Sequence, residues 1–301
     1  MRTMQTTKTF LKTSIWLIAF SMLFVITSCD KIEQGAFLED TEGKCGQDLP
    51  SFPIRKILIE DYTGHYCGNC PKAAETAESL KEIYCDHIVT IATHVGFFAA
   101  TQSNADSSYA YDFTTAMGDE LDTQFGISAQ GLPRGMVNRT EVDNKLVLAY
   151  AAWGTGVDAL VGLAPDIDID IENSYNAATR TVTTEVESEF LNNLAGTFNV
   201  VVVITEDSIV NWQNIYPFNP VPGYPTGDVE NYVHRHVLRS SFNSTWGEEI
   251  AKGDVVANTT TTKTYTMVLP DEWVEDRCSV VAYVYETSSN EVVQAEDSKV
   301  K

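Results

Sequence analysis

Two cysteines separated by two residues, Cys67 and Cys70, form the most specific chemical motif of this sequence. The segment that follows, residues 71–84, has alanine and leucine at helical spacing, so we expect a helix to begin at the cysteines. A thiolate at a helix N-terminus is stabilised by the helix dipole and by free N–H groups, which lower a thiol pKa from about 8.5 to about 3.5–7.5. The spacing also lets Cys70 attack a mixed disulfide on Cys67. The pair predicts thiol–disulfide exchange with protein substrates.

The motif has two other interpretations. Exported proteins often use closely spaced cysteines as a structural disulfide, and that alternative remains in competition with exchange chemistry. A zinc site is disfavoured, because the sequence has no second CxxC and no histidine pair at ligand spacing. We therefore expect neither a metal nor another cofactor.

The elements around the cysteines predict an α/β domain over residues 54–163. A short β-branched run before the cysteines and a second apolar run after their helix predict two buried strands. A glycine-proline turn then leads into a third strand. The predicted elements are strands at 54–61 and 87–95, helices at 70–84, 113–125 and 149–163, and a hairpin of 131–137 with 145–148.

This order of elements resembles the thioredoxin fold, and two local motifs support the resemblance. Asp61 lies six residues before the first cysteine, where thioredoxins place a buried acid. The segment Phe125-Gly126-Ile127, followed by Gly131-Leu132-Pro133, is similar to the one that precedes the cis-proline of that family.

The resemblance implies roles for individual residues. Asp61, buried beneath the cysteine pair, would take the proton from Cys70. A cis Leu132–Pro133 bond would present the backbone of Leu132 to an extended substrate strand, so Pro133 joins the predicted site. His65 either stabilises the thiolate of Cys67 or is a solvated loop residue.

Residues 164–301 change to short strands with turns between them. Residues 166–172 alternate strictly between acidic residues and isoleucine, which predicts a strand with one buried and one wet face. Further strands are predicted at 180–186, 198–205, 232–240, 261–269 and 278–286. This pattern favours an immunoglobulin-like β-sandwich domain.

Three features of this second domain permit a sharper interpretation. The aspartates of residues 166–172 could bind calcium, but alternation places them along a strand face. His234 and His236 are predicted to share a strand face, where a structural role competes with metal ligation. The segment 211–228, rich in Pro, Tyr and Asn, is either a binding surface or a loop packed over the sandwich edge.

The first 28 residues have the pattern of a signal peptide. Three basic residues precede an apolar core at 15–26 that is too short to span a bilayer. The sequence Ile26-Thr27-Ser28-Cys29 resembles the lipobox of bacterial lipoproteins, which implies acylation of Cys29 and attachment to a membrane through lipid. Residues 29–53 lack periodicity and are predicted to be a tether.

The net charge excludes some classes of partner, and the remaining cysteines predict one further disulfide and one free thiol. The net charge of −22 argues against nucleic acid and against electrostatic docking to anionic lipid. Hydrophobic residues make up 44% of the chain, which is typical of a globular protein. Cys45 in the tether and Cys85 at the end of the cysteine-headed helix are our predicted disulfide, and Cys278 in an apolar strand is a predicted buried free thiol.

The chain also resembles one family along nearly all of its mature length. The lipobox, residues 61–67, the segment GLPRGMVNR at 131–139 and the C-terminal blocks at 236–248 and 281–295 are similar to the Omp-28-like outer-membrane lipoproteins. The resemblance implies an outer-membrane, lipid-anchored protein that is periplasmic or surface-exposed. Two functions remain: an envelope thiol–disulfide oxidoreductase, or a non-enzymatic surface lipoprotein (an adhesin or assembly component binding surface ligands) with a structural CxxC.

Overall fold

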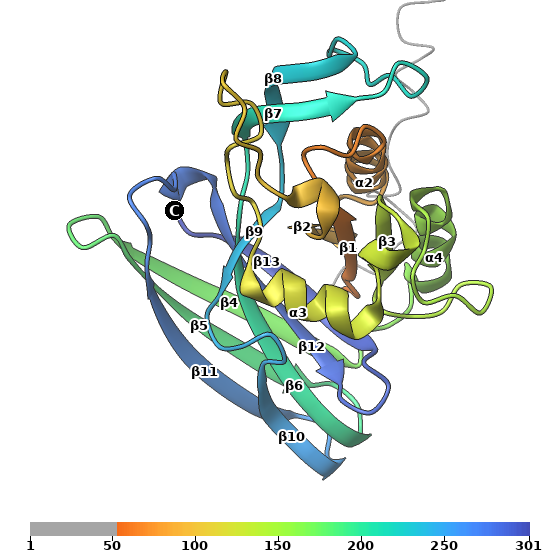
Figure 1. The fold of residues 1–301 in the computed structure, drawn as a ribbon. Helices are drawn as coiled ribbons and strands as arrows, with labels where there is room; N and C mark the ends of the chain where they lie inside the picture. The colour runs from red at the N-terminus through yellow and green to blue at the C-terminus, as the bar shows by residue number, and fades with distance from the viewer. Residues whose placement is uncertain (1–52) are drawn as a thin grey trace, which may run out of the picture. The chain divides into compact units, whose positions relative to one another are not determined.

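The structure, a computed structural model, describes residues 53–301 and is a mixed α/β protein with few helices and many strands (Figure 1). Its α-helices are α2 (Cys70–Tyr84), α3 (Ala116–Phe125) and α4 (Trp153–Leu160). None of the helices in this range combines the length and the apolarity that crossing a bilayer requires. The helix predicted at 149–163 is shorter than expected, because residues Tyr150–Ala152 form a 3-10 turn instead.

The largest sheet has eight strands. In spatial order seven of them run β13-β12-β6-β9-β2-β1-β3, and β10 pairs with β6 outside this path. Their bounds are β1 (Ile57–Thr63), β2 (Ile88–His94), β3 (Arg134–Val137), β6 (Leu194–Glu206), β9 (Val237–Ser241), β10 (Glu248–Val255), β12 (Cys278–Glu286) and β13 (Val292–Lys299). β1 runs parallel to β2 over seven residue pairs and antiparallel to β3.

This sheet crosses the predicted domain boundary at residue 164. Strands β1, β2 and β3 come from before that position, and the other five come from after it. β2 and β9 meet through the pair Ala92 and Val237. No local sequence pattern indicates this junction, because pairing between distant strands is decided by tertiary packing.

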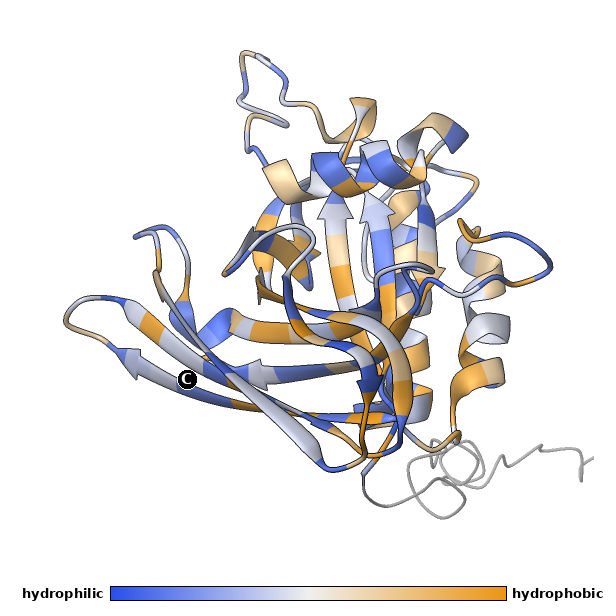
Figure 2. Cartoon of the chain, turned by 90° about the horizontal axis from the view of Figure 1, so that it is seen from below, coloured by the Kyte–Doolittle hydropathy of each residue, from blue (hydrophilic) through white to orange (hydrophobic). Residues whose placement is uncertain are grey.

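A second layer of three strands, in the order β11-β5-β4, packs against β6 and β12. Its strands are β4 (Ile167–Asn176), β5 (Thr181–Phe190) and β11 (Thr259–Val268). The predicted alternation in β4 is confirmed, since Ile167, Ile169 and Ile171 are buried and the aspartates between them are not. Figure 2 shows the hydrophobic residues concentrated along the strands of these layers.

Strand β6 is apolar on both faces, which explains its uninterrupted valine run. Val200 and Val202 face the three-stranded layer, whereas Val201 and Val203 face a second core together with Leu121 of α3. On the other side of β1, a third core is built from α2 and α4, including Ala77 and Trp153. Both faces of the eight-stranded sheet are therefore covered, which fixes β1 and the start of α2 in place.

The predicted strand at 232–240 is wrong as a single element. The chain forms β8 (Gly227–His234) and β9, separated by Arg235 and by His236 in a positive-φ conformation. His234 and His236 consequently do not share a strand face. β8 instead pairs with β7 (Ile209–Ile215) in a two-stranded hairpin, and the whole of segment 211–228, expected to be a loop, lies within this hairpin.

Candidate functional site

Cys67 and Cys70 form a disulfide at the N-terminus of α2, with their Cα atoms 5.4 Å apart. Pro71 occupies the first turn of the helix, where its missing N–H has no helical partner to lose. The side chains are almost inaccessible, with Cys67 2% and Cys70 1% exposed. The predicted helix start is confirmed, and the structure contains the pair in its oxidised form.

Asp61 lies in β1 beneath this disulfide. The residue is 2% exposed, and its Oδ1 atom has no hydrogen-bond partner among the described residues. Burial without a counter-charge raises the pKa of its carboxyl group to about 8. Asp61 and Cys70 line the same small cavity of about 20 Å³, which has room for about one water molecule. The arrangement places a protonated carboxylic acid beside Cys70 at neutral pH.

The Leu132–Pro133 peptide bond is cis, and Pro133 is buried. The next residue, Arg134, pairs with Tyr62 near the end of β1. Pro133 therefore lies beside the end of the strand from which the chain runs to Cys67. The structure brings Asp61, the two cysteines and Pro133 to one end of the β1–β3 part of the sheet.

The β7–β8 hairpin covers the cysteine turn. The backbone N–H of Asn214 donates to the carbonyl of His65 at 2.9 Å, and that of Tyr216 donates to the carbonyl of Gly68 at 2.9 Å. A Cβ atom on Gly68 would lie 2.1 Å from the ring of Tyr216, so only glycine fits between the cysteines at this position. Segment 211–228 is thus packed over the predicted redox site and not only over the sandwich edge, and no motif within it indicates this contact.

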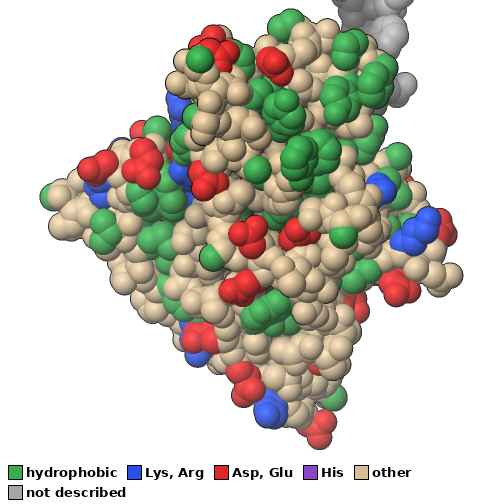
Figure 3. Space-filling view, viewed as in Figure 1, with side chains coloured by type: hydrophobic (Ala, Val, Ile, Leu, Met, Phe, Trp, Pro, Cys, Tyr) green, Lys and Arg blue, Asp and Glu red, His purple; other side chains and the backbone are tan. Residues whose placement is uncertain are grey.

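Exposed hydrophobic side chains flank the covered turn. Phe97 is 72% exposed and Phe218 is 78% exposed, and Tyr66, which adjoins Cys67, is 39% exposed. Figure 3 shows hydrophobic side chains gathered on the part of this face where Figure 1 places the β7–β8 hairpin and the segment before α3. Such a surface is suited to contact with an apolar stretch of a protein partner.

Three histidines surround Phe113 behind the cover. The ring centroids of His94 and His234 lie 4.5 and 4.6 Å from that of Phe113, and the ring of His65 lies 5.6 Å from it. Burial lowers the pKa of His65, lowers that of His94 well below its usual value and lowers that of His234 to about 3. All three rings are therefore neutral at pH 7, and His65 supplies no positive charge to a thiolate of Cys67.

Among residues 53–301, no group of three or more His, Cys, Asp or Glu side chains is arranged to hold a metal ion. The acidic residues Asp168 and Asp170 lie along β4, as the alternation predicted. Cys278 is a buried free thiol, and burial raises its pKa to about 12. Cys29 and Cys45 lie outside the described residues, so acylation and the Cys45–Cys85 disulfide remain predictions.

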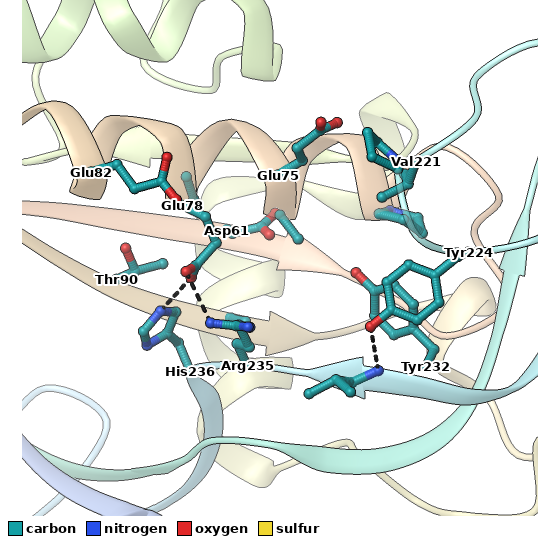
Figure 4. A pocket seen from close by; sticks show the side chains of 16 residues that line it. Asp61, Glu75, Glu78, Glu82, Thr90, Val221, Tyr224, Tyr232, Arg235 and His236 are labelled. Carbon is teal, nitrogen blue, oxygen red and sulfur yellow. Dashed lines mark hydrogen bonds and ion pairs between the residues drawn. The ribbon is translucent and has the colours of Figure 1, made fainter. Parts of the chain in front are cut away.

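A groove beside Asp61 is not among the sites predicted from the sequence. It has a volume of about 390 Å³ and runs between α2, β2 and the junction of β8 with β9 (Figure 4). Glu75, Glu78 and Glu82 line its α2 side. Their spacing along the predicted helix could have indicated a shared acidic face, because residues three and four apart lie on the same face of a helix.

Comparisons with known proteins identify the family. Residues 118–301 match the family described as outer membrane protein Omp28, which confirms the resemblance found in the sequence. Among solved structures, the chain is similar to HBP35 of Porphyromonas gingivalis, with 15% identity, a TM-score of 0.54 and coverage of 82% of this chain and 76% of that one. A domain of the outer membrane lipoprotein Omp28 from the same organism is 22% identical, with a TM-score of 0.31 over 46% of this chain and 89% of that one. Comparison with curated proteins finds no match. Because the family match covers more than half of the chain, the protein belongs to the Omp28 family and is assigned to the cell outer membrane.

Proposed function

We propose that this protein is an envelope lipoprotein that exchanges disulfides through Cys67 and Cys70 in a thioredoxin-like domain. The supporting topology is a parallel β1–β2 pair connected through the cysteine-headed helix α2, with β3 antiparallel to β1 after a cis-proline. Strands β4, β5 and β11 pack against β6, β10 and β12 in two layers, and we propose that these layers are an immunoglobulin-like sandwich that serves partner recognition. The proposed partners are protein thiols and disulfides.

The proposed reaction oxidises a substrate dithiol and reduces the protein disulfide. A substrate thiolate attacks Sγ of Cys67, the Cys67–Cys70 bond breaks, and Cys70 leaves as a thiolate that takes the proton of Asp61. The second substrate thiolate then attacks the substrate sulfur of the mixed disulfide. The substrate disulfide forms, and Cys67 leaves as a thiolate stabilised by the N-terminus of α2. In the reverse direction the ionised Asp61 accepts the proton from Cys70.

The single observation that carries this proposal is the position of Asp61. A buried carboxyl group without a partner costs free energy, and a static disulfide gains nothing from having one next to it. A carboxyl group with a pKa of about 8 beside Cys70 can hold a proton or release it near neutral pH. That property suits a group that exchanges a proton with Cys70 when the disulfide opens and closes.

The reduction potential of the Cys67–Cys70 pair tests the proposal. The protein is equilibrated in glutathione buffers, its thiols are trapped by alkylation, and the peptide that contains both cysteines is quantified by mass spectrometry. We expect a value between about −120 and −270 mV, the range of catalytic dithiols. A value below about −300 mV is typical of structural disulfides and would overturn the exchange function.

One observation favours a second candidate, a non-enzymatic surface lipoprotein such as an adhesin or assembly component. Cys67 and Cys70 are almost completely buried beneath the β7–β8 hairpin, as a structural disulfide would be. In that case the Cys67–Cys70 disulfide of the folded protein would stay oxidised throughout the range of the glutathione buffers. The same titration therefore decides between the two candidates.

Attachment to the membrane through acyl chains on Cys29 is a separate part of the proposal. Two acyl chains give stable membrane binding, whereas one gives marginal binding. A Cys29→Ser variant is expected to move from the membrane fraction to the soluble fraction on cell lysis, and the unchanged protein is expected to stay with the membrane. Retention of the variant in the membrane fraction would disprove a lipid anchor at Cys29.

A further inference from the structure

The groove beside Asp61, referred to here as the α2 groove, has the size and the polarity of a ligand site. Its volume of about 390 Å³ lies within the range of about 300–1,000 Å³ that is typical of small-molecule sites. Its floor is the face of β1 and β2 that contains Asp61, Thr90 and Ala92. Figure 4 shows α2 along one side of this floor, and Arg235, His236 and Tyr232 along the opposite side.

Two buried polar atoms on this floor have no partner within residues 53–301. These atoms are Oδ1 of Asp61 and Oγ1 of Thr90, in residues that are 2% and 5% exposed. The register of the parallel pair sets Asp61 opposite Ala92, and Thr90 lies two residues earlier in β2, so both side chains are on the same face of the sheet. Each unsatisfied buried group costs about 1–3 kcal/mol. A ligand that donates hydrogen bonds to both oxygens would remove this cost.

The charged groups around the floor favour a positive ligand. Glu78 is bound by His236 at 2.7 Å and by Arg235 at 3.3 Å, and Glu75 is paired with Lys72 at 2.5 Å. Glu82 has no side-chain partner in the described part of the chain, and it lines the same groove. The lining therefore contains one unpaired carboxylate in addition to the Asp61 carboxyl group, and no unpaired cation.

The remaining side of the groove is apolar and aromatic. Val221 and Tyr224 line it together with Tyr232 from β8. The hydroxyl of Tyr224 accepts a hydrogen bond of 3.3 Å from the backbone N–H of Val233, which fixes that ring against the groove (Figure 4). The two tyrosine rings lie 4.8 Å apart. An apolar stem can pack on this side while a charged head reaches the floor.

We infer that the α2 groove binds an organic monocation, a guanidinium or alkylammonium head on a short apolar stem. The head donates hydrogen bonds to Asp61 and Thr90, the stem packs on Val221 and Tyr224, and Glu82 attracts the charge. The same chemistry is available from a free small cation or from an arginine or lysine side chain of a polypeptide. Binding does not require thiol–disulfide exchange, so this site goes beyond the proposed function.

The test is isothermal titration calorimetry of the oxidised protein with two probes. n-Butylguanidinium represents the free cation and N-acetyl-arginine amide represents the polypeptide side chain, while N-acetyl-norleucine amide is the neutral control. We expect binding of at least one cationic probe and none of the neutral control. Equal affinity for both cations would assign the site to a small molecule, and a clear preference for the capped arginine would assign it to a polypeptide.

Variants of the groove test which residues bind the cation. Thr90→Val and Glu82→Gln are each expected to weaken binding by about tenfold, which corresponds to the loss of one hydrogen bond or charge contact. Glu120→Gln removes an exposed carboxylate from α3 and is the matched control, with unchanged affinity expected. Absence of binding, or equal weakening in all three variants, would overturn the inference.

A second readout reports on Asp61 itself. Its carboxyl group is protonated at pH 7 and ionises when a cation binds beside it, so binding releases a proton. Titrations in buffers of different ionisation enthalpy measure that release. We expect proton release in the unchanged protein and in a Cys67→Ser/Cys70→Ser variant, and none in Asp61→Asn. Binding without proton release would exclude Asp61 as a ligand, whatever the reduction potential of the cysteine pair is found to be.

Discussion

The side-chain amide of Gln213 donates a hydrogen bond of 3.0 Å to the carbonyl oxygen of Cys67, a residue 146 positions earlier in the chain. Together with the backbone bonds from Asn214 and Tyr216, it holds the β7–β8 hairpin over the cysteine turn. Any thiolate that reduces this disulfide at Cys67 must reach Sγ of Cys67 in line with the S–S bond, and the residue is 2% exposed. We therefore expect opening of this hairpin to control access to the disulfide.

Weakening the cover is expected to speed reduction. Gln213→Ala removes the hydrogen bond to Cys67 together with a local one to the carbonyl of Asn214. The bond to Cys67 is worth about 1 kcal/mol, so reduction by dithiothreitol should be accelerated about fivefold. Tyr216→Ala removes the ring above Gly68 and should have an effect of the same direction. The rate is measured by alkylation and mass spectrometry. Gln130→Ala is the control, because Gln130 is exposed and its side-chain amide donates to the nearby carbonyl of Gly126. Identical rates in all variants would show that the hairpin does not limit access.

Asp61 is expected to make stability depend on pH. Its pKa is raised from 3.8 to about 8 in the folded protein, so the folded state binds the proton more tightly than the unfolded state does. Stability from this group is full below about pH 4 and is lost as the pH rises to about 8, by an amount on the order of 5 kcal/mol. Asp61→Asn should therefore raise the free energy of unfolding at pH 8.5 much more than at pH 5.

Urea unfolding at the two pH values measures this difference. Asp254→Asn, an exposed change on β10, is the matched control and should have the same small effect at both values. An Asp61→Asn effect that is equal at pH 5 and pH 8.5 would contradict a carboxyl group that stays protonated through neutral pH.

Breaking the buried ion pair of Arg139 and Glu60 is expected to destabilise the fold strongly. The guanidinium donates to both carboxylate oxygens, at 2.8 and 2.9 Å, and to the hydroxyl of Tyr283 at 3.0 Å. It thereby connects β1 to β12, from the two ends of the described chain. Arg139→Met leaves a buried carboxylate unpaired and should cost about 3–5 kcal/mol.

Chemical denaturation measures the loss. Lys263→Met breaks the more exposed pair with Glu248, at 3.2 Å, and should cost at most about 1 kcal/mol. The double variant Glu60→Leu/Arg139→Met should recover part of the loss, because no unpaired charge remains. Equal losses of unfolding free energy in Arg139→Met and Lys263→Met would contradict a special role of the buried pair in stability.

The predicted Cys45–Cys85 disulfide is expected to join the segment before β1 to the end of α2. Peptide mapping without reduction should yield one linked peptide that contains both cysteines. Because the bridge would close a loop of 41 residues, its removal in Cys85→Ser should cost about 4 kcal/mol in the chain-entropy description. Recovery of Cys85 only in unlinked peptides would disprove the pairing.

The sequence by itself determined the local features that depend on neighbouring residues. The start of α2 follows from Cys70, Pro71 and the helical spacing after them, and the buried face of β4 follows from strict alternation. The glycine-proline segment before β3 and the family membership could likewise be recognised from the sequence, because both rest on short motifs of contiguous residues.

Only the tertiary structure decided which segment covers the Cys67–Cys70 disulfide and which of the nearby side chains are charged. The pairing of β2 with β9, the bond from Gln213 to Cys67 and the approach of Arg139 to Glu60 join residues that are far apart in the chain. Such contacts are selected by packing and burial in the folded molecule, and no local periodicity encodes them. For the same reason the sequence placed an acid six residues before Cys67, but only burial made that acid neutral at pH 7.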